Sequence, residues 1–338
     1  MKTLNTRQKN ILSSIVRSYI DKASPVGSQH LVENYRLKCS PATIRNEMVR
    51  LEDMGYIQQP HTSAGRVPTD EGYKLYISEL MQPEPLTPRD HEQIRGKIFE
   101  AGGNMNLILE EASRILGKVS DELGVVLTPW ISWGIFDRLE FLKIADQKVL
   151  VVIHVCSRLV KTVILEVESD LEQDDLEKTA DVLNERLSGL TLEEIQSSID
   201  DRVRNTSRGN RMLMHRVVEL ASDLFDFSEP LDVHTCGTYN ILSQPEFSNI
   251  DMRESLLSLI DNKRRLIKLF HRKVDDVEIR VGLDNEDKGL HSFTVITARY
   301  SRGKDVGTLG VIGPTRMRYR RILPLMNFMT QTMCQHLG

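Results

Sequence analysis

The pattern of helices and turns in the first 70 residues constrains the fold of this chain most strongly. Apolar residues recur at helical spacing over 6–22 and predict an amphipathic helix with one wide apolar face. A second, short helix is expected over 28–35, after a stretch that contains proline and glycine. A third is expected over 41–54, because Ser40 is a favourable N-cap, proline occupies the first helical position and Gly55 follows the last turn.

A short hairpin is expected directly after the third helix. Residues 56–59 predict a strand, 60–65 a turn and 66–67 a return strand. Thr69 is then placed to cap a further helix, with two acidic residues in its first turn. Three helices followed by a β-wing are the plan of a winged helix-turn-helix, which we expect over residues 1–82.

The rest of the chain predicts a mixed α+β body. Residues 82–88 contain three prolines and predict a stiff linker, so 83–104 is interpreted as a linker and a connecting helix. Strands are expected at 125–128, 139–144, 149–155, 160–167, 278–283, 292–300 and 307–312. Helices are expected at 89–100 and 105–123, within 171–228, and at 317–336.

The order of these elements indicates an interrupted domain. The strand-rich C-terminal part needs a helix and a strand from elsewhere, and the segment 105–128 offers both. We therefore expect one domain built from 105–134 and 231–338. The segment 135–230, with three antiparallel strands and several helices, is expected to be an inserted domain.

Charge is distributed unevenly along the chain. Residues 1–82 hold 11 of the 44 lysines and arginines but only 8 of the 48 acidic residues, a net charge of +3 against −7 for the remainder. A basic end on an acidic body is attracted to phosphates through that end only. The N-terminus lacks the apolar run of a signal peptide, and the four cysteines form no CxxC pair, so a cytoplasmic protein with free thiols is expected.

The helical phase of 41–54 divides its side chains into a core face and an outer face. Ile44, Met48 and Leu51 fall on one side, and the outer face carries the candidates for base contact. Asparagine can pair with adenine and arginine with guanine, while alanine or threonine can touch a thymine methyl group. The alternative is that this outer face is an ordinary solvated helix surface that does not contact DNA. The outer and flanking residues are Ala42, Thr43, Arg45, Asn46, Val49 and Arg50.

The predicted wing, 59–69, is rich in small and hydroxyl-bearing residues, a composition that suits close approach to a phosphate backbone. The alternative is that this segment is a plain hairpin that does not contact DNA. Its DNA-binding candidates are His61, Thr62, Ser63 and Arg66, which join Ser40, Ala42, Thr43, Arg45, Asn46 and Arg50 of the third helix.

Catalytic and metal-binding signatures are missing from the sequence. Asp284, Glu286 and Asp287 lie close together but lack the alternating spacing of a calcium loop, and they are interpreted as part of a turn. His154 lies in an apolar strand and is interpreted as a core or interface residue. No P-loop, GxSxG or HExxH motif is present. We expect neither an enzyme nor a cofactor.

Several sequence blocks closely resemble the heat-inducible transcription repressors of the HrcA family. The blocks are Pro25-Val26-Gly27-Ser28, Ser40-Pro41-Ala42-Thr43-Ile44-Arg45-Asn46, Gln59-Pro60-His61-Thr62-Ser63-Ala64-Gly65-Arg66-Val67-Pro68-Thr69, Gln244-Pro245-Glu246-Phe247 and Gly307-Thr308-Leu309-Gly310-Val311-Ile312-Gly313-Pro314-Thr315-Arg316-Met317. Their order and spacing are kept over essentially the whole chain.

The resemblance implies a winged helix, a GAF-like α/β domain and an inserted dimerising domain. It also implies a homodimer that binds an inverted-repeat operator, the CIRCE element, upstream of chaperonin and Hsp70-type operons. Repression would be supported by a GroEL-type chaperonin and relieved on heat stress, when chaperonin is limiting. Two alternatives stay open: a regulator with a small effector in the GAF-like domain, and an enzyme with a winged-helix appendage. The first requires an apolar pocket with converging polar groups.

Overall fold

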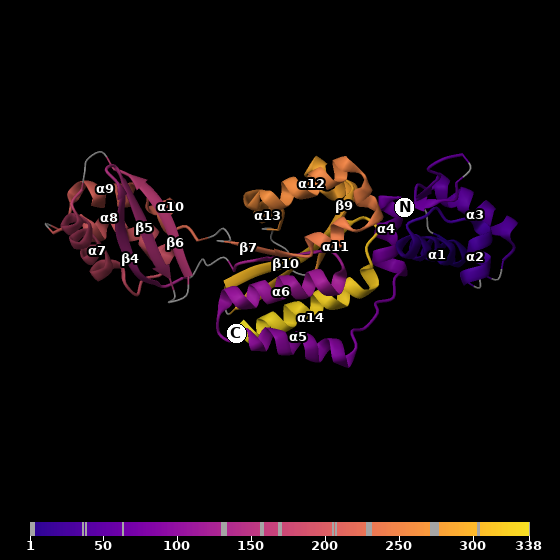
Figure 1. Ribbon diagram of the computed structural model, residues 1–338, viewed down its shortest axis with the longest axis horizontal. Coiled ribbons are helices and arrows are strands. Elements are labelled where there is room, and N and C mark those ends of the chain that lie inside the picture. Colours follow the sequence, from indigo (N-terminus) through magenta and orange to yellow (C-terminus); the bar gives the residue numbers. More distant parts are fainter. Residues whose placement is uncertain are drawn as a thin grey trace. The chain divides into compact units, whose positions relative to one another are not determined.

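The chain folds into two compact units, which are described separately. The first contains residues 1–126, 233–300 and 308–337, and the second contains 127–232 and 301–307. The computed structural model (Figure 1) describes residues 4–35, 37, 39–62, 64–129, 134–155, 159–167, 171–204, 206, 208–227, 232–270, 277–302 and 305–337.

The N-terminal part of the first unit is a winged helix-turn-helix. Its helices are α1 (Thr6–Lys22), α2 (Ser28–Tyr35), α3 (Pro41–Asp53) and α4 (Asp70–Leu75), which continues as the π-helical turn η1 (Tyr76–Leu80). Asn5 caps α1 and Ser40 caps α3 through their side chains, as the sequence predicts for α3. The apolar faces of α1 and α3 pack together in the core, and burial of these faces stabilises the arrangement of the two helices.

The wing is a two-stranded antiparallel ribbon of β1 (Ile57–Gln58) and β2 (Val67–Pro68), with Ile57 opposite Pro68. Its return strand also bridges Val26, because the backbone groups of Val26 and Arg66 exchange two hydrogen bonds of 2.9 Å. The hairpin is therefore tied to the loop between α1 and α2 as well as to α3.

The body of the first unit is a five-stranded sheet in the order β7-β3-β10-β9-β8, with helices on both faces (Figure 1). Every residue of β3 is buried, as expected of a strand covered on both sides. The strands are β3 (Leu123–Leu127), β7 (Val233–Cys236), β8 (Glu278–Val281), β9 (Phe293–Arg302) and β10 (Asp305–Pro314). The helices are α5 (Pro88–Glu100), α6 (Met105–Ser120), α11 (Thr238–Leu242), α12 (Ile250–Asp261), α13 (Lys263–Phe270) and α14 (Tyr319–Leu337). Three 3₁₀ turns complete it: η2 (Pro245–Ser248), η3 (Gly282–Asp284) and η4 (Lys288–Leu290).

The second unit is a three-stranded antiparallel sheet, β4-β5-β6, with helices on one face. Alternate residues of β5, such as Val149 and Val151, are buried against the helices, while those between them face outward. The strands are β4 (Phe136–Ala145), β5 (Lys148–Val155) and β6 (Leu159–Glu166), and the helices are α7 (Gln173–Leu187), α8 (Leu192–Val203), α9 (Arg211–Glu219) and α10 (Ala221–Leu224).

Most elements expected from the sequence are confirmed, including the three antiparallel strands and the final helix. The helix expected over 105–123 ends earlier, at Ser120, because Asp121 adopts a left-handed conformation with φ of +61°. Strand β7 and helices α11 to α13 were not predicted. Within the described residues, no helix has the length and apolar character needed to cross a membrane.

Candidate nucleic-acid interface

Helix α3 is anchored by the three residues predicted for its core face. Ile44 and Leu51 are completely buried and Met48 is 5% exposed. Their spacing of four and three residues places them on one side of the helix. The opposite side therefore cannot take part in the core, and its side chains are free to meet a ligand.

The outer face of α3 carries Ala42, Arg45, Asn46 and Val49, all of them exposed. Val49, an apolar residue on this face, is 45% exposed. Two polar side chains and two apolar ones thus share this face. The mixture matches the hydrogen-bonding groups and methyl groups of a major groove.

The N-terminus of α3 is shaped by the hydroxyls of Ser40 and Thr43. The backbone N–H of Thr43 donates to Ser40 Oγ over 3.1 Å, and the two hydroxyls are 2.9 Å apart. This cap leaves Ser40 exposed and Thr43 half-buried. Each hydroxyl keeps further hydrogen-bonding capacity, so the cap does not prevent either from donating to a phosphate.

Arg50, the last candidate on α3, is paired within the protein. Its guanidinium donates to Glu47 Oε1 over 3.0 Å, and the Gln8 amide donates to Glu47 Oε2 over 3.1 Å. Glu47 is only 5% exposed although it is an acid on a short helix. Sequence reasoning did not single out Glu47; the spacing of three residues to Arg50 is the signal that predicts the pair.

Gln59 holds the tip of the wing in shape. Its side-chain amide donates to the carbonyls of Thr62 and Ala64 over 2.9 and 3.1 Å. His61 and Thr62 are exposed on this tip, and Ser63 lies outside the described residues. Two predicted contact residues of the wing, His61 and Thr62, are therefore exposed to solvent on a loop that the Gln59 side chain holds through hydrogen bonds.

Arg66 does not occupy the exposed position expected for it. Its side chain is 17% exposed, and its Nε and NH2 donate to Glu52 Oε2 over 3.0 and 2.8 Å. The ion pair joins the wing to the C-terminal turn of α3. The expectation of an exposed Arg66 is wrong, because its guanidinium lies against Glu52 of α3 and is partly buried there. A separation of 14 residues concealed this partner from sequence reasoning.

Gly65 lies where the wing meets the loop after α1. A Cβ at this position would lie 2.5 Å from the carbonyl carbon and oxygen of Val26. Only glycine permits the return strand to approach this closely and form the backbone bridge at Val26. The small residues of the wing thus have a structural role besides any contact with DNA.

Comparison with known proteins gives a consistent result over both parts of the chain. Residues 3–81 match the family described as winged helix-turn-helix transcription repressor, HrcA DNA-binding, and residues 106–323 match the HrcA protein C terminal domain. The chain is 36% identical to the heat-inducible transcription repressor HrcA of Chlorobium phaeobacteroides (strain BS1), with 99% of each protein covered. It is 37% identical to that of Prosthecochloris aestuarii (strain DSM 271 / SK 413), with 97% of each covered.

The chain belongs to the HrcA family. It is accordingly a transcription repressor with a winged-helix DNA-binding domain, and not an enzyme. A solved structure named "Crystal structure of a hypothetical protein at 2.2 A resolution" is similar over 99% of both chains, with a TM-score of 0.63 and 22% identity. That likeness supports the fold alone.

Two of the acidic residues near Gly289, Asp284 and Asp287, pair with basic side chains in this HrcA family member. Arg265 donates to both carboxylate oxygens of Asp287, over 2.5 and 2.7 Å, and this pairing holds the pKa of Asp287 below its ordinary value. Asp284 accepts a hydrogen bond from Lys74. Among the described residues, no three His, Cys, Asp or Glu side chains are grouped as a metal site. Asp284 and Asp287 therefore have a structural explanation.

A hollow of about 240 Å³ lies in the body beside Glu122. Polar and charged side chains line it, among them Asp121, Gln244 and Arg316. An effector-binding domain would instead require a mainly apolar pocket with a few polar groups. The alternative of a metabolite-responsive regulator therefore gains no support from this hollow.

Proposed function

We propose that the chain is a cytoplasmic homodimeric repressor in which each winged helix reads one half-site of an inverted-repeat operator. The observation that carries this proposal is the exposed face of α3, on which Arg45 and Asn46 project opposite the buried Ile44 and Leu51. Half-site symmetry matches the two-fold symmetry of a dimer. The bound dimer blocks transcription by occupying the promoter.

The proposed DNA contacts divide into reading and anchoring groups. Asn46, Arg45 and Ala42 read base edges, with Thr43 beside them. Ser40, Arg50, His61, Thr62 and Ser63 contact phosphates or the minor groove. Arg66 has a different role, because it holds the wing against Glu52 and so orients His61 and Thr62.

The domain assignment follows the family plan. Residues 1–82 form the DNA-binding domain, 83–104 the linker and connecting helix, 105–134 with 231–338 a GAF-like domain, and 135–230 an inserted dimerising domain. In the second unit, the β4-β5-β6 sheet supports this assignment through its uncovered face. The register aligns Leu142, Leu150 and Ile164 across its three strands.

The strongly exposed apolar residues of this face are two members of the row, Leu142 and Ile164, and two others, Ile144 and Val160. Ile164 is 55% exposed, Ile144 50%, Val160 48% and Leu142 45%. An open apolar face of this kind is typical of a surface that a partner covers. We assign a second copy of the chain as that partner, because one patch used by both copies makes a self-complementary two-fold interface.

Control by a GroEL-type chaperonin completes the proposal. The operator is the CIRCE element upstream of chaperonin and Hsp70-type operons, and repression is relieved when stress-damaged proteins occupy the chaperonin. The test is footprinting of the full chain on the promoter of its own chaperonin operon, with and without chaperonin. We expect a protected inverted repeat and stronger protection when chaperonin is present. Protection that small metabolites restore, and chaperonin does not, would favour the effector-binding alternative.

A further inference from the structure

A hollow of about 250 Å³ in the first unit carries more positive than negative charge. Its walls come from α1 and η1 of the winged helix, from the linker and from the start of α14. Four arginines and two acids line it, which gives a net charge of +2. These charged residues are Arg17, Asp21, Glu84, Arg318, Arg320 and Arg321. None of them is among the proposed DNA contacts, so a ligand of this hollow goes beyond the proposed function.

Three of the four arginines lie at the end of α14 where positive charge is least favourable. Arg318 immediately precedes this 19-residue helix, and Arg320 and Arg321 belong to its first turn. The aligned peptide dipoles of a helix leave a partial positive charge at its N-terminus, which favours acidic side chains or a bound anion there. The first turn of α14, all of which is described, contains no acidic residue. An anion in the hollow would therefore relieve the repulsion among these charges.

Hydrogen bonds with the linker hold Arg320 at this hollow. Pro324 lies inside α14 and has no N–H to donate to the carbonyl of Arg320, and the backbone N–H of Glu84 donates to that carbonyl over 2.8 Å. The Arg320 side chain donates from Nε to the carbonyl of Gln82 over 2.8 Å. Because a guanidinium group has five N–H donors, this one bond leaves further donors for a ligand.

Tyr76 of η1 is the residue whose burial points to a ligand in this hollow. It is 1% exposed, and within the described part of the chain its hydroxyl has no hydrogen-bond partner. A buried hydroxyl without a partner destabilises a fold unless a water molecule or a ligand satisfies it. Because Tyr76 lines the hollow, a ligand bound there can accept the hydrogen bond that the protein does not provide.

Charges from both sides of the hollow act on the Tyr76 hydroxyl. Burial raises the pKa of Tyr76, the positive charges of Arg320 and Arg17 oppose this rise, and Asp21 adds to it. The guanidinium of Arg17 lies over the ring of Tyr35, 5.7 Å from its centre, which keeps this arginine at the hollow. A neutral donor and two guanidinium groups on different elements thus lie close to one another.

We propose that this hollow binds the phosphate group of a small molecule, inorganic phosphate included. A guanidinium group matches the oxygens of phosphate and can form two parallel hydrogen bonds with them. The net charge of +2 suits a phosphate group, which carries about −1.5 to −2 near pH 7, better than a carboxylate with its single charge. A volume of about 250 Å³ holds a phosphate with few further atoms and is smaller than the pockets that bind drug-sized ligands.

The position of the hollow favours a small molecule over the DNA backbone as the source of the phosphate. Among the described residues that line it, none belongs to α3 or to the wing, which carry most of the proposed DNA contacts. Arg17 and Tyr76 belong to the winged helix, whereas Arg320 and Arg321 belong to α14 of the body. A bound phosphate therefore contacts both parts of the first unit. Since a ligand that binds only the folded chain stabilises it, phosphate should raise the stability of this protein.

The test measures the binding of inorganic phosphate to the full chain by isothermal titration calorimetry and by the rise in Tm. Chloride at the same ionic strength controls for screening of charges. We expect saturable binding to the unmodified chain and a higher Tm in phosphate than in chloride. Arg321→Gln and Tyr76→Phe should each weaken the affinity for phosphate about 10-fold or more, because each removes a hydrogen bond to a charged group.

Tyr73→Phe is the matched control for Tyr76→Phe. Tyr73 is 2% exposed and its hydroxyl also lacks a partner within the described residues, but it does not line this hollow. Arg89→Gln changes an exposed arginine of α5 outside the hollow. Both controls should bind phosphate as the unmodified chain does. Without phosphate, Tyr76→Phe should be at least as stable as the unmodified chain, because it removes an unpartnered buried hydroxyl; this separates a loss of binding from a folding defect.

Three results would overturn the inference. If the unmodified chain shows no saturable binding of phosphate, the hollow is a water-filled cavity. If it binds phosphate and both Arg321→Gln and Tyr76→Phe bind it equally well, the phosphate site lies elsewhere. If phosphate does not bind and Arg321→Gln reduces the salt dependence of binding to a scrambled duplex by about one unit of slope, the arginine contacts the DNA backbone. Calorimetry with phosphate uses no DNA, so its outcome does not depend on the proposed operator binding.

Discussion

Arg66 and Glu52 form an ion pair that joins the wing to α3. The Arg66 side chain is 17% exposed and that of Glu52 is 31% exposed, so the pair is less screened than a surface pair. Arg66→Ala should lower the free energy of unfolding by about 1–3 kcal/mol, because it leaves the Glu52 carboxylate without its partner. Chemical denaturation measures this loss. A change below about 0.5 kcal/mol would show that the pair contributes little.

A double-mutant cycle separates this structural role from contact with phosphate. Glu52→Gln combined with Arg66→Ala should restore part of the lost stability, since no charge then lacks a partner. If Arg66 also contacted one phosphate directly, removing it would reduce the salt dependence of DNA binding by about one unit of slope. We expect a smaller reduction because Glu52 already neutralises the guanidinium.

Glu122 is a buried acid between α6 and β3, and burial raises its pKa well above the ordinary value. A hydrogen bond of 2.9 Å from Gln244 partly opposes this rise. Because the pKa is higher in the folded than in the unfolded state, the group's contribution to stability is complete below the unfolded pKa and is lost as pH rises through the folded one.

Glu122→Gln should therefore stabilise the chain increasingly as pH rises from about 4.5, the region of the unfolded pKa. The expected gain is about 1.4 kcal/mol for every pH unit by which burial raises the pKa. Unfolding free energies at pH 5 and pH 8 measure it. Parallel pH profiles for the two proteins would contradict the prediction.

The wing depends on a close backbone approach at Gly65. Gly65→Ala places a methyl group 2.5 Å from the backbone of Val26 and should separate the return strand from the bridge at that residue. We expect destabilisation by about 1–3 kcal/mol and weaker binding to all DNA sequences. Gly27→Ala is a suitable control, because no atom lies within 4 Å of a Cβ at residue 27. If the two variants had the same stability and the same affinity for DNA, the wing would not require glycine at position 65.

The elements that the sequence predicted best are those with strong local signals. The three helices of the winged helix were found from amphipathic spacing and from the cap at Ser40. Strand β7 (Val233–Cys236) was missed because it is short and follows a segment without a clear period. Helices α11 and α12 were missed because few of their side chains are buried, which weakens the pattern, and α13 was missed because it is shorter than the window over which a helical period can be recognised.

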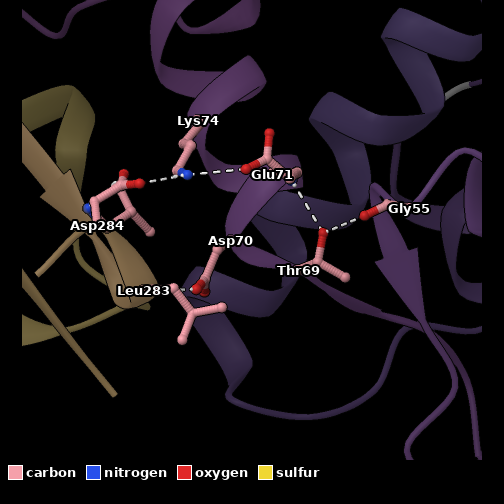
Figure 2. Close-up of polar contacts among 9 residues, drawn as sticks. Gly55, Thr69, Asp70, Glu71, Lys74, Leu283 and Asp284 are labelled. Atoms are coloured by element: carbon pink, nitrogen blue, oxygen red, sulfur yellow. Dashed lines mark hydrogen bonds and ion pairs between the residues drawn. The ribbon is translucent and has the colours of Figure 1, made fainter. Parts of the chain in front are cut away.

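The candidate site was predictable in its outline but not in its contacts. The helical spacing of Ile44, Met48 and Leu51 correctly predicted which side of α3 is buried. This prediction needs only the spacing of residues within one helix. The partner of Arg66 comes from another element, and the backbone N–H of Leu283 donates to the carboxylate of Asp70, 213 positions away (Figure 2). Such pairings depend on tertiary packing, which composition and periodicity do not describe.

The uncovered sheet of the second unit leads to a prediction about assembly. Ile164 belongs to its apolar row and is 55% exposed. Ile164→Lys should convert the dimer to a monomer, because it introduces a charge into the proposed interface without altering the core. Analytical ultracentrifugation measures the change. Ser197→Lys, on the exposed side of α8, is the control and should leave the dimer intact. A dimer that survives Ile164→Lys would place the interface elsewhere.

The most direct test of sequence-specific repression is the affinity of the full chain for its operator and for a scrambled duplex at several salt concentrations. The unmodified chain should prefer the operator, and Asn46→Ala should lose about 1–3 kcal/mol per half-site on the operator and little on the scrambled duplex. Asn10→Ala, which changes an exposed asparagine on α1, should alter neither affinity. Equal weakening of Asn46→Ala on both duplexes would contradict the assignment of α3 as the reading helix.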